Sequence, residues 1–241
     1  SARTNERWSV PVVARHVGGG DAVRTLLEPN GANTVTLACG AYLVNAGQSG
    51  FFRVKYDDSN FGLLTQRFSE LESVDQLGLL LDYYAFGRSG DASFSNYLDL
   101  VDVIPADADP VIVMDTAASM SAFASYTHDR PSAEAVRAYG RRVLGPYFQR
   151  VGWAPRLGDD ANLTNMRATL ITTLGSLGDE AVIAEARRRV RAAQTDPSAL
   201  PAAIRNAART VYAANATEED FNALLTQARA ETVQRALQTG N

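Results

Sequence analysis

The chain has 241 residues, of which 46% are hydrophobic, and a formal net charge of −4. It can bury the core of one large or two smaller domains, and its acidic balance argues against a nucleic-acid binder, which needs a basic face. No apolar run approaches the roughly 20 residues that span a bilayer. Cys39 is the only cysteine, which excludes an intrachain disulfide and a cysteine metal cage. The sequence does not determine the cellular compartment, and the cytoplasm is slightly favoured.

The first 57 residues consist of short β-branched runs that glycine and asparagine interrupt. Such runs between tight turns are typical of antiparallel strands. In the last run, Phe52, Val54 and Tyr56 would share one face of a strand. The expected strands are residues 8–17, 22–27, 34–37, 41–44 and 51–56. We predict that they form a small antiparallel β-sandwich domain over residues 1–57.

Helical spacing begins at Asp58. Phe61, Leu64 and Phe68 recur at steps of three and four residues, as on the buried face of a helix. The next helix should start with a capping box, Ser73 to Gln76, and end at Ser89 and Gly90. Further helices are expected at residues 92–103, 109–126, 131–151 (kinked or split at Gly145–Pro146), 162–177, 179–195, 197–215 and 217–238.

Short turns between these helices favour an α-solenoid of HEAT- or armadillo-like helix pairs over residues 58–241, although no strict sequence period is present. The predicted class is therefore mainly α with a small N-terminal β part. Solenoids normally end in a capping repeat. The sequence ends at Asn241 without a capping repeat, so we expect the helical domain to be truncated and the natural protein to be longer.

The residues that most often carry catalysis are few and scattered. His16 and His128 are the only histidines, and no HExxH zinc motif is present. A histidine-based site is possible in principle, but one hydrogen-bonded sheet histidine and one exposed loop histidine is the favoured interpretation. Cys39 lies among apolar residues and is expected to be buried rather than nucleophilic. Gly18 to Gly20 precede a strand and not a helix, which favours a turn over a phosphate loop.

Charged clusters also have simple structural interpretations. The carboxylate pairs Asp57–Asp58 and Asp159–Asp160 could bind a cation, but acidic residues before a helix are more often caps. The basic run Arg187 to Arg191 could contact an acidic surface, with a solvated helix face as the default. Trp153 is expected to be a packing anchor between helix pairs. We therefore predict no catalytic, cofactor-binding or metal-ligating residue in this chain.

The segment Asn45 to Asp57 nevertheless carries a specific resemblance. It matches the pattern N-x-G-Q-x-G-[FY]-[FY]-R-V-x-Y-D of the aminopeptidase N and puromycin-sensitive aminopeptidase family of zinc metallopeptidases. Further segments resemble the family in the same order: residues 8–12, 79–86, 151–153 with 158–160 and 166–167, and 209–212. The resemblance thus extends over almost the whole chain.

This resemblance implies the family's β-sandwich domain, without its first strand, followed by part of the helical C-terminal domain. In the family the catalytic domain comes earlier and carries the HExxH helix, a further glutamate ligand and the GxMEN substrate loop. None of these is present in this chain, so no site residue can be transferred. The resemblance places zinc in a preceding catalytic domain. It also implies two partners for this chain: that catalytic domain of the same polypeptide, and peptide substrates.

Two functions from different classes follow. The first is the non-catalytic C-terminal portion of a zinc aminopeptidase that removes N-terminal residues from peptides, a portion that covers the active-site cavity and helps to admit or bind peptide. By itself this chain is expected to be inactive. The alternative is a free-standing sandwich-plus-solenoid module that binds a peptide or protein without catalysis. A structural remnant without a ligand is a third possibility. Substrate preference and oligomeric state stay open.

Overall fold

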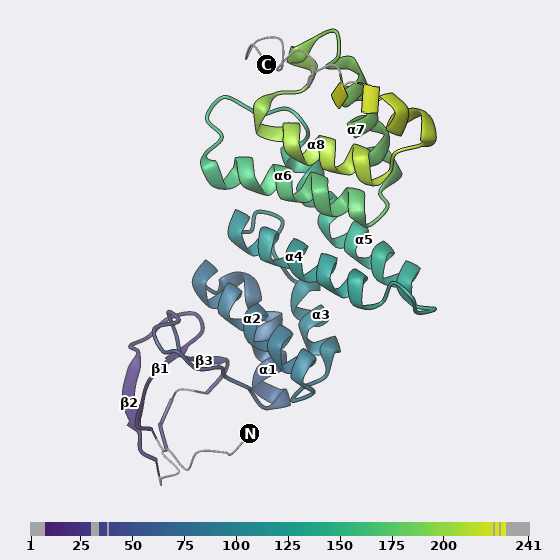
Figure 1. Cartoon of the computed structure of the whole chain (residues 1–241). Coiled ribbons are helices and arrows are strands. Elements are labelled where there is room, and N and C mark those ends of the chain that lie inside the picture. The colour runs from purple at the N-terminus through teal and green to yellow at the C-terminus, as the bar shows by residue number, and fades with distance from the viewer. Residues whose placement is uncertain (1–7, 30–33, 38, 224, 227, 230–241) are drawn as a thin grey trace. The chain divides into compact units, whose positions relative to one another are not determined.

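The computed structural model describes residues 8–29, 34–37, 39–223, 225–226 and 228–229. The chain forms two compact units, residues 1–112 and 113–241. In Figure 1 the first unit runs from the purple strands through the blue helices, and the second contains the green and yellow helices. The predicted domains, 1–57 and 58–241, remain a prediction.

Strands in the first unit form one antiparallel sheet in the order β2-β1-β3, with β1 from Val10 to His16, β2 from Val23 to Leu27 and β3 from Tyr42 to Val44. In the central strand, Val12 lies opposite Thr25 and Ala14 opposite Val44. Val12 and Ala14 are buried while their neighbours are partly exposed, as the alternation of side chains along a strand requires. Gly18 to Gly20 form the predicted turn, all with positive φ.

Two of the five predicted strands are not strands. Residues 34–37 and 51–56 have extended or irregular backbone outside the ladder. In the second segment, side chains of a helix take the place of a strand partner. The Val54 N–H donates to Asp82 at 2.9 Å, and the Tyr56 N–H donates to the Tyr83 hydroxyl at 3.3 Å. A second sheet, which a sandwich needs, is not found among the described residues.

The outer edge of β3 is also occupied by side chains. Asn60 accepts from the Tyr42 N–H at 3.1 Å and donates to the Tyr42 carbonyl at 2.9 Å. The Tyr56 hydroxyl accepts from the Val44 N–H at 2.9 Å and donates to its carbonyl at 3.2 Å. Unpaired edge groups would attract another strand. Here the two side chains satisfy them and attach β3 to the first helix.

The helices of the first unit are α1 (Asp58–Gln66), η1 (Phe68–Glu70), α2 (Ser73–Ser89) and α3 (Phe94–Asp102). Their core contains the predicted Leu64 and Phe68, both at most 1% exposed. The predicted capping box at Ser73 is wrong, since the N-cap of α2 is Glu72 and makes no side-chain cap bond. Gln76 instead donates to the carbonyls of Phe68 and Leu71, both at 3.0 Å.

The second unit contains most of α4 (Pro110–Tyr126), then α5 (Ala133–Val151), α6 (Ala161–Ser176), α7 (Glu180–Ala192), η2 (Pro197–Ala199) and α8 (Ala202–Ala214). Helix α5 continues through Pro146, so of the two expected outcomes there, a kink or a split, the split does not occur and the kink stays a prediction. The single helix predicted at 197–215 is divided, because Asp196 caps η2 and Pro201 starts α8.

Small residues allow the helices of the second unit to approach closely. A Cβ added to Gly175 on α6 would lie 2.5 Å from Val211 on α8. A Cβ on Gly140 of α5 would lie 2.7 Å from Leu177, the C-cap of α6. Helix α6 therefore packs between α5 and α8, and its Met166, Leu170 and Ile171 are fully buried.

After α8, residues 218–223 are helical and begin the predicted last helix, whose end lies outside the described residues. The observed class, mainly α with a small N-terminal β part, confirms the prediction. Within the part of the chain that the structure describes, no helix is both long enough and apolar enough to span a membrane.

Candidate functional site

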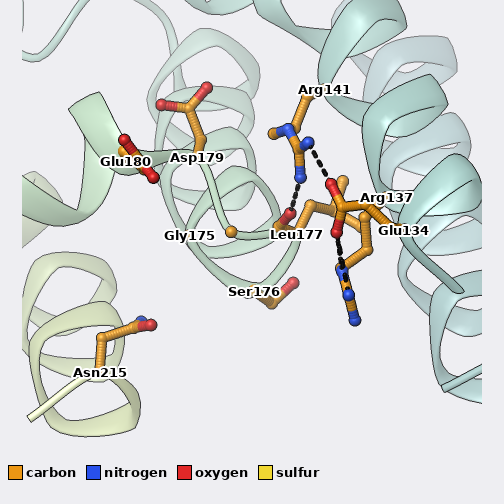
Figure 2. Close-up of a pocket in the computed structure, with 10 residues that line it drawn as sticks. Glu134, Arg137, Arg141, Gly175, Ser176, Leu177, Asp179, Glu180 and Asn215 are labelled. Atoms are coloured by element: carbon orange, nitrogen blue, oxygen red, sulfur yellow. Dashed lines mark hydrogen bonds and ion pairs between the residues drawn. The ribbon is translucent and has the colours of Figure 1, made fainter. Parts of the chain in front are cut away.

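A polar pocket of the second unit lies where one end each of α6, α7 and α8 meets a face of α5 (Figure 2). Its volume is about 620 Å³. The lining residues come from four helices and the turn between α6 and α7: Glu134, Arg137, Arg141, Gly175, Ser176, Leu177, Gly178, Asp179, Glu180 and Asn215.

One wall is a charged cluster on α5. Glu134, Arg137 and Arg141 are three and four residues apart, which places them on one face of the helix. Glu134 accepts from Arg137 at 3.0 Å and from Arg141 at 2.7 Å, as Figure 2 shows. The hydrogen bonds from Arg141 and Arg137 lower the pKa of Glu134 below its ordinary value. One carboxylate therefore orients two guanidinium groups toward the pocket.

The opposite wall is the turn that connects α6 to α7. Leu177 ends α6, and Gly178 follows with φ +78°, a left-handed conformation that glycine adopts without strain. Arg141 donates to the Leu177 carbonyl and so joins the two walls. Asp179 caps α7 by accepting from the Val182 N–H at 3.0 Å, and Glu180 occupies the first turn. This wall carries two carboxylates and faces the arginine wall.

A buried carboxylate outside the pocket supports the third side of the pocket through hydrogen bonds. Asn215, the C-cap of α8, accepts from Arg187 at 2.9 Å through its carbonyl. Arg187 also donates to Asp220, which is fully buried, at 3.1 Å. Asp220 accepts further from Arg191 at 2.6 Å and from the Tyr212 hydroxyl at 2.9 Å. It therefore joins α7, α8 and the helix that follows α8.

Hydrogen bonds decide the charge state of Asp220. Burial alone would raise its pKa, but the Thr217 N–H, Arg191 and Tyr212 all donate to it and together hold the pKa well below the usual range. Thr217 and Asp220 also form a capping box, because the Asp220 N–H donates back to the Thr217 hydroxyl at 3.2 Å. The donors around Asp220 thus favour its charged form.

The pocket offers two guanidinium groups beside Glu134 on one wall and the carboxylates of Asp179 and Glu180 on the other, a combination that suits a polar ligand with both donors and acceptors. It holds neither a histidine nor a cysteine. Across the described ranges, no group of three or more His, Cys, Asp or Glu side chains could hold a metal ion. The residues that the structure describes therefore do not fit a zinc site.

The structure does not bring the histidines together with the cysteine thiol in a catalytic arrangement. His16 lies in β1 and its Nε2 is 3.1 Å from the Cys39 carbonyl. His128 is exposed in the turn after α4, paired with Asp129 at 2.9 Å. Cys39 is exposed, so its predicted burial is wrong. It lines a second pocket of about 650 Å³ between the sheet and α1, whose other walls are mainly apolar.

Most of the predicted structural roles are confirmed. Asp57 caps α1, and Asp160 caps α6 by accepting from the Leu163 N–H at 2.8 Å. Asp159 accepts from the Arg156 N–H and from the buried Arg167, which lower its pKa.

Trp153 packs edge-on against Phe148 with ring centroids 5.8 Å apart, and Arg189 lies over its face at 5.2 Å. It therefore links α5 to α7 as the predicted anchor. Arg188 and Arg191 of the arginine run are exposed, as the predicted solvated face requires. All four arginines are nevertheless ion-paired: Arg187 and Arg191 bind Asp220, and Arg188 and Arg189 pair with Glu185.

Sequence reasoning missed the pocket. The spacing of Glu134, Arg137 and Arg141 is a detectable signal for a charged face on one helix. Nothing in the sequence shows that this face meets the turn at Gly178, or that Asn215 lies nearby, because those contacts join segments far apart in the chain.

Comparisons with known proteins identify the family. The family model of the ERAP1-like C-terminal domain matches residues 41–239. Tricorn protease-interacting factor F2 of Thermoplasma volcanium is 25% identical over 181 residues, covering 73% of this chain and 21% of that protein. Aminopeptidase M1-A of Oryza sativa subsp. japonica is 29% identical over 151 residues, or 61% of this chain and 17% of that protein. Aminopeptidase M1 of Arabidopsis thaliana is 28% identical over 199 residues, covering 79% of this chain and 22% of that protein.

The chain therefore spans about a fifth of the length of the curated relatives that it matches. The family model covers most of the chain, from the end of the sheet region to the C-terminal residues, and agrees with the resemblance in residues 45–57. The chain belongs to the ERAP1-like C-terminal domain family, the C-terminal region of M1 aminopeptidases.

Proposed function

We propose that this chain is the non-catalytic C-terminal portion of a longer zinc aminopeptidase that removes N-terminal residues from peptides. In that polypeptide it covers the active-site cavity and helps to admit and bind the peptide. The zinc ion and the catalytic residues belong to a part of the polypeptide outside this chain. Closure of a separate portion over a catalytic site restricts water and positions the substrate.

The match of the family model to residues 41–239 carries the proposal. It is supported by the relatives, several of which bear the name aminopeptidase and are several times longer than the matched segment. The length of those relatives provides room for a catalytic portion that this chain lacks.

The pocket between α5 and the α6–α7 turn is the proposed peptide contact. An extended peptide exposes N–H and C=O groups alternately, and the pocket presents guanidinium donors across from carboxylate acceptors. Arg137 is suited to contact a ligand, because Glu134, with which it forms an ion pair, is itself largely exposed. Arg141 also supports the Leu177 carbonyl and is therefore partly structural.

The test compares substrates of different length in the natural full-length polypeptide. We expect Arg137→Ala to raise KM for peptides long enough to reach the pocket by about threefold to tenfold, as for loss of one exposed charged contact. It should leave KM and kcat for an aminoacyl-arylamide unchanged, because that substrate is too small to reach the pocket. Arg142→Ala, on the same helix but outside the pocket lining, is the matched control.

An equal change for the long peptide and the arylamide would contradict a peptide-contact role for Arg137. A polypeptide that binds peptides and hydrolyses none would instead support the alternative, a binding module without catalysis.

A further inference from the structure

The loop at residues 45–50 has a backbone that most residues avoid. Asn45 and Gln48 have positive φ values of 63° and 51°, although neither is glycine, and Gly47 lies between them at 75°. Left-handed conformations of this kind cost free energy and persist where the surrounding structure holds them.

Three sets of contacts hold this loop. The Asn45 side chain accepts from the Gly50 N–H at 2.7 Å and donates to the Gly50 carbonyl at 2.9 Å, which closes the loop on itself. The Ala46 N–H donates to the Val13 carbonyl of β1 at 3.1 Å. The Gly47 N–H donates to Asp75 of α2 at 2.7 Å. The loop is thus fixed to both the sheet and a helix.

Packing on either side removes the remaining freedom. The other carboxylate oxygen of Asp75, whose side chain is fully buried, pairs with Arg15 at 3.0 Å. Gln48 lies against Gly78 of α2, where a Cβ would overlap its side chain. A Cβ on Gly50 would likewise overlap the Phe52 ring. Beyond the loop, Val54 is held by Asp82.

The side chain that this rigid segment presents is Phe51, which is fully exposed at 110% of its reference area. The other exposed side chains of residues 51–56 are Arg53 and Lys55. Arg53 is 61% exposed and lies 3.8 Å from Asp82, and Lys55, the only lysine in the chain, donates to the Asp91 carbonyl. A rigidly held aromatic group loses little entropy when it binds, which is why such groups serve as anchors at protein interfaces. The strip formed by Phe51, Arg53 and Lys55 is apolar at one end and positively charged at the other.

We infer that this strip is a docking surface for the part of the same polypeptide that lies outside this chain, and that Phe51 inserts into an apolar pocket with acidic groups beside it. The inference rests on the proposed function, since it requires the longer polypeptide. The occupant follows from the length of the relatives, most of which lies outside the matched segment, and from the charge of Arg53 and Lys55.

The test is hydroxyl-radical footprinting of this chain and of the natural full-length polypeptide. We expect oxidation of Phe51 to be about tenfold slower in the polypeptide, as for a side chain that passes from exposed to buried. Leu157, which is also fully exposed at 107%, is the control and should react at the same rate in both. Lys55→Glu should restore part of the reactivity of Phe51 in the polypeptide by repelling the acidic groups.

Equal rates of Phe51 oxidation in this chain and in the polypeptide would overturn the inference. Equal protection of Phe51 and Leu157 would also overturn it, because it would show a general loss of exposure and not a specific contact at Phe51. Protection that appears in this chain alone as its concentration rises would assign Phe51 to self-association and contradict the proposal. Full protection in the Lys55→Glu variant would contradict the acidic partner surface.

Failure of the docking surface can be distinguished from failure of the proposed function. If the full-length polypeptide is an active aminopeptidase and Phe51 in it is oxidised as fast as in this chain, only the docking surface is contradicted. If Phe51 is protected but the polypeptide has no aminopeptidase activity, only the proposed function is contradicted. A natural polypeptide no longer than this chain contradicts both.

Discussion

At the scale of single residues, buried carboxylates organise both units. Asp75 and Asp82 project from α2 and hold backbone N–H groups of residues 45–56, and burial raises the pKa of both despite these bonds. Asp220 holds three helical segments of the second unit, and hydrogen bonds lower its pKa. The opposite shifts reflect the number of donors around each carboxylate.

Asp220→Asn should destabilise the second unit by about 2 kcal/mol at neutral pH, because the bonds to Arg187 and Arg191 lose their charge assistance. A carboxylate with a lowered folded-state pKa contributes stability above its unfolded value of 3.8, and this stability is lost as the pH falls through the folded value. The difference between variant and parent should therefore shrink in acid. Urea unfolding followed by Trp153 fluorescence at about pH 7 and about pH 3 measures it.

Glu219→Gln is the control for that measurement. Glu219 is 85% exposed and lies 3.7 Å from Arg191, so its loss should cost less than about 0.5 kcal/mol. A cost for Asp220→Asn as small as that of the control, or one that does not change with pH, would contradict the role assigned to Asp220.

At the scale of elements, the sheet ends where side chains replace a strand. The Tyr56 hydroxyl forms hydrogen bonds with both backbone groups of Val44 at the outer edge of β3. Removal of the hydroxyl would leave the Val44 N–H without that acceptor, and an unsatisfied amide is costly unless water reaches it.

Tyr56→Phe should therefore make the Val44 amide exchange its hydrogen about tenfold faster, which corresponds to about 1.4 kcal/mol of local stability. Hydrogen exchange resolved at the level of single amides measures this. Tyr42→Phe in the same strand is the matched control, because the Val44 bonds do not involve Tyr42. Similar exchange in the two variants would show that Tyr56 does not seal this edge.

The sequence predicted the helices better than the β part, for a physical reason. Helix α2 ends at Ser89 as expected, because its pattern and its stop at Gly90 are local signals. Residues 51–56 alternate in exposure as a strand would: Tyr56 is buried, Phe52 and Val54 are partly buried, and the residues between them are exposed. Their backbone partners, Asp82 and Tyr83, lie on a helix some 30 residues later, which no local pattern reveals.

The same limit applied to the pocket. Its arginine wall was visible as spacing on one helix, but the facing turn at Gly178 and the carbonyl of Leu177 become neighbours only through packing. The ion pairs of Asp220 with Arg187 and Arg191 join residues about 30 apart, so no local pattern predicts them.

At the scale of the whole molecule, the chain combines a sheet-bearing unit and an all-helical unit. The relatives that it matches are much longer, and two of those named above are called aminopeptidases. The pocket of the helical unit and the Phe51 strip of the other unit are then surfaces with different proposed partners. We propose that the pocket contacts peptide and that the strip contacts the rest of the polypeptide.

Hydrolysis of an aminoacyl-arylamide by the natural full-length polypeptide and by this chain tests the central claim most directly. We expect the polypeptide to release the N-terminal residue, to lose activity with a metal chelator and to recover it with zinc, while this chain hydrolyses nothing. A full-length polypeptide without metal-dependent activity, or chelator-sensitive hydrolysis by this chain alone, would contradict the account.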